Sequence, residues 1–342
     1  MRVDGWSLLA LLRFALAAIV AAVHLRDHGE LGLLQPLAML GGFEAVLGFL
    51  AISGYSVTVS HAQRPQGFLR RRLQRVAPAY LACLMLTLIV ATGLQHALLP
   101  GLPEIAANAL LLNQLVTRTS ILGPAWSLAL ECWLYLSLPW LALQSAAQVR
   151  RLAWLSFAAF AAFTIGRAGL RLPYFAGVGY GANLVLLGFA WFTGSLMARG
   201  DADAAMALRT LRWMFAGHIV LDVLIQFGHR LKHGEAGRFA VDDLPGFCLQ
   251  ACTLWIVARC LAYVLERPLA PRIRSRWMNV LGDWSYPLYL VHLPVYSAIS
   301  VLGLLAPAPA FVAAVGAAVA LHHLVERPLR RRPCHQVCTG AA

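Results

Sequence analysis

The sequence predicts an all-α protein, a polytopic membrane bundle of about ten transmembrane helices with both termini in the cytoplasm. Of the 342 residues, 60% are hydrophobic and only 13% are charged, whereas about a quarter of a soluble domain is charged. Apolar stretches of about 20 residues, long enough to cross a bilayer as a helix, recur along the chain. Alternating polar and apolar strands are absent from the sequence, which leaves helices to satisfy the backbone in lipid.

The ten predicted spans are joined by mostly short loops. They cover residues 6–25, 41–60, 77–95, 126–145, 152–168, 180–198, 210–227, 246–265, 279–300 and 306–325. The first span holds an arginine and lacks a small-residue cleavage site, so we expect it to remain in the protein rather than act as a signal peptide. Longer loops are expected at 96–125, 199–209 and 228–245. Apolar residues 105–116 are too few to span, so an interfacial or re-entrant helix is expected there.

The basic residues set the predicted orientation. There are 28, all arginine except Lys232, and they give a formal charge of +13. Most fall in segments on the side of the N-terminus, which the positive-inside rule assigns to the cytoplasm. Topology and contact with anionic lipid therefore explain the charge, and no nucleic-acid partner is predicted. We expect residues 1–330 to form one transmembrane domain and 331–342 a short cytoplasmic tail.

The seven cysteines do not predict a metal site. Five lie in predicted spans, where thiols pack as small hydrophobic groups. Cys334 and Cys338 lie in the tail, and their spacing lacks the second pair that a zinc site needs. No metal is predicted.

Arg13 and His24 are costly polar residues in the otherwise apolar first span. Eleven residues at about 100° each bring both side chains to one helical face, about 16 Å apart along the axis. Each residue alone fits an interface anchor, but their shared face favours a cavity or a partner.

An arginine cluster, FLRRRLQR at 68–75, follows the second span on the predicted cytoplasmic side. Arginines in such clusters bind phosphates through bidentate hydrogen bonds. Composition alone favours the alternative, a topology signal that contacts lipid headgroups.

Glu131 lies about 8 Å inside the outer edge of the fourth span, in an apolar and aromatic helix. A carboxylate there should be paired or neutralised. Because the first and fourth spans run in opposite directions, Glu131 and His24 both fall in the outer half of the membrane. A carboxylate that orients a histidine is a common general-base arrangement, and a bond between helices is the equal alternative.

Other polar residues also lie at membrane depth. The second span holds Ser53 and Tyr55, the fourth begins with Trp126 and Ser127, and the ninth contains Tyr286 and His292. Glu44, Asp222 and Asn183 are interpreted as structural.

Taken together, these segments resemble the acyltransferase-3 family of integral-membrane acyltransferases. The resemblance rests on five ordered features: Arg13 with His24; FLAISGY at 49–55; Arg72 and Arg75 followed by Pro78 and Tyr80; WSLALECWLY at 126–135; and LGDWSYPLYLVH at 281–292, with VERP at 325–328. They extend over essentially the whole chain. The chain departs from the family at Glu44, Leu47 and Cys132, which concerns the details of the pocket more than the reaction.

The resemblance implies transfer of an acyl group, most often acetyl, from cytoplasmic acyl-coenzyme A to a hydroxyl of an envelope carbohydrate or glycolipid. It implies a bacterial inner-membrane enzyme with acyl-CoA as donor substrate and no permanently bound cofactor. His24 would be the essential histidine, and Arg13, Arg72 and Arg75 would bind the donor, together with Ser53 and Tyr55.

As a mechanism, we expect His24 to remove the proton of the acceptor hydroxyl and Glu131 to orient its ring. The residues expected to line the acyl pocket or donate to the oxyanion are Trp126, Ser127, Tyr286 and His292. The sequence does not exclude a covalent acyl-enzyme.

Two alternatives remain open from the sequence. One is a ten-span transporter of a small solute or lipid with a His24–Glu131 proton relay, although the two halves show no inverted repeat of polar positions. The other keeps the chemistry with a lipid or small-molecule acceptor. The sequence is compatible with a monomer or a dimer.

Overall fold

The computed structural model describes residues 4–170, 172–266, 275–304 and 306–330, and all regular elements within them are helices. Residues 331–342, the predicted tail with Cys334 and Cys338, lie outside the described residues. A helix coincides with each of the ten predicted spans. These helices are α1 (Gly5–His24), α3 (Gly42–Gln63), α4 (Phe68–Ile89), α6 (Trp126–Ala142), α7 (Ala146–Leu170), α8 (Ala182–Leu196), α9 (Asp201–Lys232), α11 (Leu244–Leu265), α12 (Arg276–Val301) and α13 (Pro307–Leu321).

Seven helices in the described part of the chain are long and apolar enough to cross a membrane. They are α1, α3, α4, α7, α9, α11 and α13, with α4 and α13 each continued by a π-helical turn. Of the remaining three, α6 has 17 residues, α8 has 15, and α12 carries a more polar sequence. The chain is therefore a helical membrane protein, and the number ten and the orientation stay predictions.

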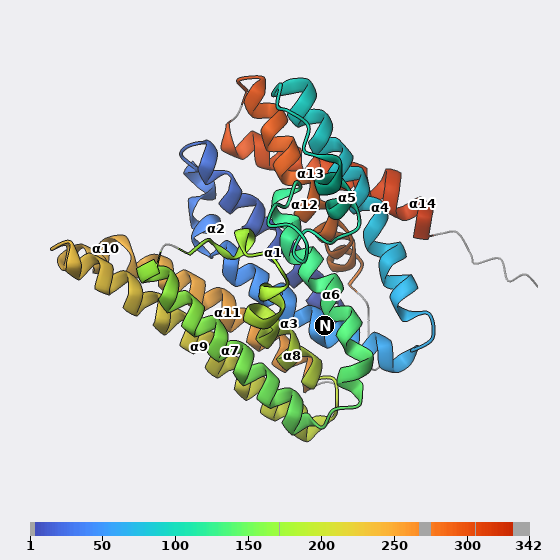
Figure 1. Cartoon of the computed structure of the whole chain (residues 1–342), viewed down its shortest axis with the longest axis vertical. Coiled ribbons are helices and arrows are strands. Elements are labelled where there is room, and N and C mark those ends of the chain that lie inside the picture. The colour runs from blue at the N-terminus through green and yellow to red at the C-terminus, as the bar shows by residue number, and fades with distance from the viewer. Residues whose placement is uncertain (1–3, 171, 267–274, 305, 331–342) are drawn as a thin grey trace, which may run out of the picture.

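The site is built around α1, which packs along α12 and beside α3 in the middle of the bundle (Figure 1). Asp4 caps α1, because its Oδ1 accepts from the backbone N–H of Ser7 at 3.0 Å. Small residues bring α1 and α12 together: a Cβ atom on Gly282 would lie 2.4 Å from Cβ of Ala10. Such close approach is typical of helix packing in membranes, where apolar side chains gain little by leaving lipid.

α3 and α8 cross at two glycines that face each other. A Cβ atom on Gly54 would lie 2.1 Å from the carbonyl oxygen of Trp191, and one on Gly194 would lie 2.1 Å from that of Ala51. Each glycine therefore makes room for the backbone of the other helix. This contact fixes the rotation of α3, whose side chains line both cavities described below.

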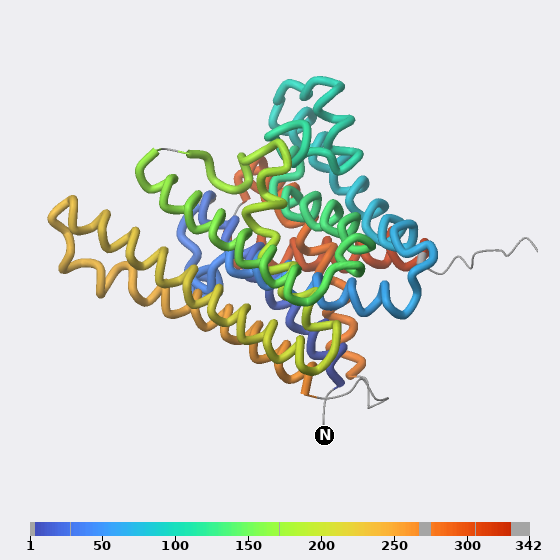
Figure 2. The backbone as a smooth tube through the Cα atoms, turned by 60° about the horizontal axis from the view of Figure 1, so that its bottom comes forward, coloured from blue at the N-terminus to red at the C-terminus, as the bar shows by residue number. Residues whose placement is uncertain are grey.

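α9 and α11 lie side by side and project to one side of the bundle as a long hairpin, joined through α10 (Phe239–Asp242) (Figure 2). α9 begins at Asp201 and ends at Lys232, so the loops predicted at 199–209 and 228–245 are largely helical. The prediction was wrong there because charged residues at the two ends of α9 hide a helix that extends past its apolar centre.

The loop 96–125 contains the helix α5 (Leu102–Ala109), which is too short to span. The buried side chain of Asn108 holds the loop together. Its amide donates to the carbonyl oxygens of Glu104 and Thr119 at 3.0 and 3.2 Å, and its Oδ1 accepts from the backbone N–H of Ile121 at 2.9 Å. The loop thereby brings Pro124 and Trp126 to the end of the bundle that contains His24.

Candidate active site

Two cavities open beside α1, and Tyr289 of α12 lines both. We name them after the predicted orientation: the inner cavity, about 120 Å³, contains Arg13, and the outer cavity, about 450 Å³, contains His24. The Tyr289 hydroxyl donates to the carbonyl oxygen of Pro124 at 2.8 Å and lies 2.6 Å from Oγ of Ser127. Tyr289 therefore stands between the two cavities. The sequence analysis selected Tyr286 and missed Tyr289, although the two lie three residues apart on one face of α12.

The inner cavity brings together three of the arginines expected to bind the donor. Arg13 of α1 and Arg72 and Arg75 of α4 all line it. The Arg13 guanidinium donates to Oγ of Ser56 at 2.6 Å, which fixes its position within the bundle. Arg71 of the same cluster turns away and donates to the backbone carbonyl of Arg64 at 2.5 Å.

Glu131 also lines the inner cavity, where its carboxylate accepts hydrogen bonds from Ser53 and Tyr135. The expected contact with His24 was therefore wrong, since His24 lines the other cavity. The rotation of α6 turns Glu131 and Ser127, four residues apart, towards the inner cavity. Glu131 places a negative charge beside the arginines, not beside the histidine.

Ser53 and Tyr55 were expected to act together, and the structure separates them. Ser53 lines the inner cavity, whereas Tyr55 is buried on another side of α3, with its ring centroid 6.2 Å from that of Trp6. Residues two apart on a helix point about 200° apart, so they cannot share a face. Ser56, three residues after Ser53, lines the cavity instead.

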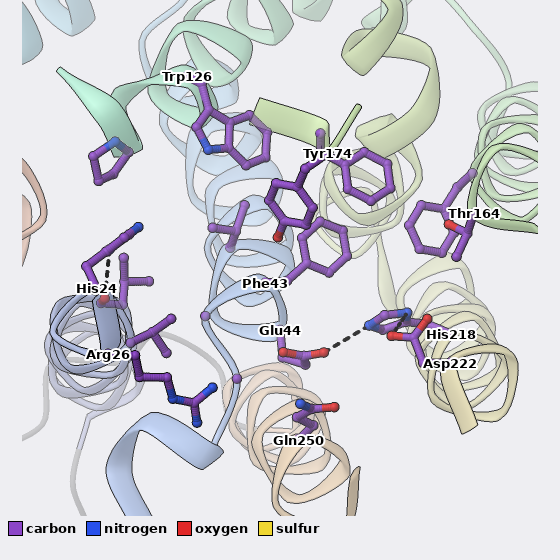
Figure 3. Close-up of a pocket in the computed structure, with 18 of the residues that line it drawn as sticks. His24, Arg26, Phe43, Glu44, Trp126, Thr164, Tyr174, His218, Asp222 and Gln250 are labelled. Carbon is purple, nitrogen blue, oxygen red and sulfur yellow. Dashed lines mark hydrogen bonds and ion pairs between the residues drawn. The ribbon is translucent and has the colours of Figure 1, made fainter. Parts of the chain in front are cut away.

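His24 projects from the end of α1 into the outer cavity (Figure 3). Its Nδ1 lies 3.0 Å from the carbonyl oxygen of Val20, and this oxygen can only accept, so Nδ1 carries the proton. Nε2 of His24 is then left with its lone pair. A histidine in this tautomer can accept a proton on Nε2, as a general base requires.

His292 was expected in the substrate pocket, but it lines neither cavity and is fully buried behind His24. Its Nδ1 lies 3.0 Å from the carbonyl oxygen of Leu288, which places the proton there and makes Nε2 an acceptor. That Nε2 lies 3.1 Å from Nδ1 of His24. His292 is thus the partner that the sequence analysis sought in Glu131.

The other residues expected in the pocket divide between the two cavities. Trp126 lines the outer one, and Ser127 and Tyr286 line the inner one. The Tyr286 hydroxyl donates to the carbonyl oxygen of Val76 at 2.8 Å, which ties α12 to α4.

A polar cluster faces His24 from the far side of the outer cavity (Figure 3). His218 Nε2 lies 3.1 Å from Glu44 Oε1, and His218 Nδ1 lies 3.5 Å from Asp222 Oδ2. One potential metal-ligating atom from each of Glu44, His218 and Asp222 lies within 4.8 Å of the other two, a spacing that could also hold a metal ion. The sequence analysis interpreted Glu44 and Asp222 as structural and passed over His218, although His218 and Asp222 are four residues apart on one helical face.

Tyr174 borders the same cavity from the loop after α7. Burial, aided by the charge of Glu44, raises the pKa of its phenol. The hydroxyl therefore stays protonated at neutral pH and can donate a hydrogen bond.

The chain resembles known proteins along most of its length. A family model described as an acyltransferase domain matches residues 6–325. Acyltransferase MdmB of Streptomyces mycarofaciens is 28% identical over 273 residues, which cover 74% of this chain and 68% of that protein. No solved structure matches the chain significantly.

Proposed function

The chain belongs to the acyltransferase-3 family, and from this premise we propose that it transfers an acyl group, acetyl in the first instance, from cytoplasmic acyl-CoA to a hydroxyl of an envelope carbohydrate. Because it belongs to this family, the chain is a membrane acyltransferase. The donor, the acetyl group, the carbohydrate acceptor and a bacterial inner-membrane location are the parts proposed here.

The observation that carries the proposal is the succession of two chemically different cavities along α1. The inner cavity offers three guanidinium groups, from Arg13, Arg72 and Arg75, and these suit the phosphates of coenzyme A. Its volume of about 120 Å³ suits a narrow arm and not a nucleotide. We therefore place the nucleotide at the cytoplasmic mouth and the thioester at the inner end of the arm, near Tyr289.

The outer cavity supplies the base. The acceptor hydroxyl gives its proton to Nε2 of His24 as its oxygen attacks the thioester carbonyl carbon. The new C–O bond forms, the C–S bond breaks, and the proton passes from His24 to the departing thiolate. Ser127 and Tyr289 offer hydroxyl groups at the junction of the cavities, where the oxyanion would develop.

The proposal is tested with membranes that contain the full chain at matched expression. Radiolabelled acetyl-CoA is supplied on the cytoplasmic side, and label is counted in the envelope fraction. His24→Ala should abolish incorporation, while His229→Ala, which removes an exposed histidine from the outer end of α9, should leave it unchanged.

Isolation of the labelled product then identifies the acceptor. Label in lipid or in a small molecule would replace the carbohydrate. Folded wild-type protein that moves no acyl group from acetyl-CoA or longer donors would refute the donor assignment, and full incorporation by His24→Ala would refute the choice of base.

A further inference from the structure

We infer that the wall of the outer cavity opposite His24, formed by Glu44, Thr164, Arg167, His218 and Asp222, is a binding site for a neutral, hydroxyl-rich ring such as a sugar residue. The inference rests on the proposed function, because it names the site that would hold the acceptor. All five residues line the same cavity as His24.

Buried polar atoms in this wall lack protein partners. Oγ1 of Thr164 and Nε of Arg167 are both buried, and neither has a hydrogen-bond partner within the described part of the chain. An unsatisfied buried polar group destabilises the protein, so such groups call for a ligand or ordered water. Two such atoms, both in residues that line one cavity, indicate a polar occupant.

Arg167 is held ready for such an occupant by aromatic rings. Its Cζ lies 5.1 Å from the ring centroid of Tyr174 and 5.6 Å from that of Phe175. Stacking fixes the plane of a guanidinium while its N–H groups keep pointing outward in that plane. Arg167 therefore presents directed donors at little entropic cost.

The charges in the wall select against an ionic ligand. The carboxylates of Glu44 and Asp222 face the imidazole of His218, and Arg167 borders the same cavity. Groups of both signs leave no single net charge for a ligand to neutralise. They offer carboxylate acceptors and guanidinium donors, and a hydroxyl group can use both because it donates and accepts.

These charges also argue against a metal ion on Glu44, His218 and Asp222. A divalent cation binds best where carboxylates dominate, but Arg26 and Arg167 line this cavity as well. A neutral ligand meets no such repulsion.

Aromatic faces complete the site. The rings of Phe43 and Phe175 stack with centroids 4.9 Å apart. The rings of Phe43 and Phe160 each form a T-shaped pair with the His218 ring, with centroids 5.5 Å apart. A pocket that combines apolar faces with a few convergent polar groups suits a ring with C–H faces and a hydroxyl rim.

Gly41 maintains the position of Glu44. A Cβ atom at Gly41 would lie 1.9 Å from Oε2 of Glu44, and the φ angle of Gly41 is +88°, which side chains rarely adopt. Glu44 lies in the first turn of α3, where the helix dipole favours a negative charge. The backbone is thus shaped around this carboxylate.

The test measures binding without any acyl donor, so that it is independent of catalysis. Full-length protein in lipid nanodiscs is titrated with methyl β-D-glucopyranoside, and binding is followed by saturation-transfer NMR. Wild type should bind. Arg167→Met should weaken binding by about 10- to 100-fold and the nearly isosteric Thr164→Val by about 3- to 10-fold.

The matched control is Arg118→Met. Arg118 also stacks on a tyrosine, 5.3 Å from the ring centroid of Tyr180, but it lies outside the cavity. The Arg118→Met variant should bind the glycoside as tightly as wild type does. Absence of glycoside binding by folded wild type, or equal loss in Arg118→Met, would overturn the inference even if acyl transfer is found. Tight Mn²⁺ binding that is lost in Glu44→Gln, without glycoside binding, would replace it with a metal site.

Discussion

The imidazole Nε2 of His292 lies 3.1 Å from Nδ1 of His24, and the two rings have centroids 5.1 Å apart. Within the described part of the chain, neither ring is hydrogen-bonded to a carboxylate. The partners are the Val20 and Leu288 carbonyls and the other histidine, so Nδ1 carries a proton in both rings, and His292, which accepts on Nε2, is neutral. His292 is therefore a positioning residue: it holds the ring of His24 without touching a cavity.

His292→Phe should lower kcat by about 100-fold, because His24 loses the acceptor that holds its ring. His292→Gln, whose Oε1 can still accept from His24 Nδ1, should recover part of the rate. Steady-state kinetics with acetyl-CoA should show an unchanged KM for the donor. A fall in kcat of equal size for both variants would indicate a packing role only.

Tyr289→Ala should join the two cavities. Water then gains access to the thioester, and we expect acceptor-independent release of free coenzyme A to rise relative to transfer. Tyr289→Phe keeps the ring and loses only the hydroxyl contacts with Ser127 and Pro124, so transfer should slow without this increase. A thiol-detection assay with and without acceptor distinguishes the two effects, and an unchanged ratio in Tyr289→Ala would contradict the separating role.

Arg72→Met and Arg75→Met should each raise the KM for acetyl-CoA by about tenfold, since each removes a guanidinium from the inner cavity. Arg70→Met is the control, because Arg70 is exposed in the same cluster and does not line the cavity. Equal effects of all three substitutions would indicate general attraction of the anionic donor to the membrane surface.

Gly54→Ala should destabilise the crossing of α3 and α8, because the added methyl group meets the backbone of Trp191. Overpacking of this kind costs about 1–3 kcal/mol or more. Gly228→Ala in α9, where nothing lies within 4 Å, should raise stability slightly by favouring the helix. Thermal unfolding in detergent measures both, and a Tm for Gly54→Ala at or above that of wild type would refute the packing argument.

Arg230 holds the outer end of the α9–α11 hairpin through ion pairs with Glu235 and Asp243, both at 2.8 Å. Hydrogen bonds from Arg230 lower the pKa of Glu235 and of Asp243. Carboxylates with lowered folded-state pKa values stabilise the fold above their ordinary pKa of about 4, and this stabilisation is lost as the pH falls through the lowered values. The Tm difference between wild type and Arg230→Met should therefore shrink on acidification. A difference that stays constant with pH would contradict this.

Most of the helices could be predicted because they contain long apolar runs, which the chain needs wherever its backbone meets lipid. Arg13, Arg72, Arg75, Ser53 and Glu131 were expected to act in donor binding or catalysis, and the structure gathers them in one cavity. The pattern of apolar residues did not predict how each helix is rotated about its own axis. This rotation depends on contacts such as Gly54 with Trp191, so the sequence assigned Glu131 to His24. The pairing of Tyr55 with Ser53 was an error that helical periodicity alone excludes. In the cluster around His218, the spacing of His218 and Asp222 was a local signal, but the contact with Glu44 joins α3 to α9 and has none.

The contact between His24 and His292 joins residues 268 positions apart in the chain. At about 5–20 residues per second, a ribosome needs about 10–50 s to make the intervening segment. Through that interval the imidazole of His24 in the nascent α1 lacks its final neighbour, whereas the partner of Arg13, Ser56, follows 43 positions after it. During biogenesis of this enzyme, the first helix therefore depends for a time on the insertion machinery, or on lipid headgroups, for hydrogen-bonding partners.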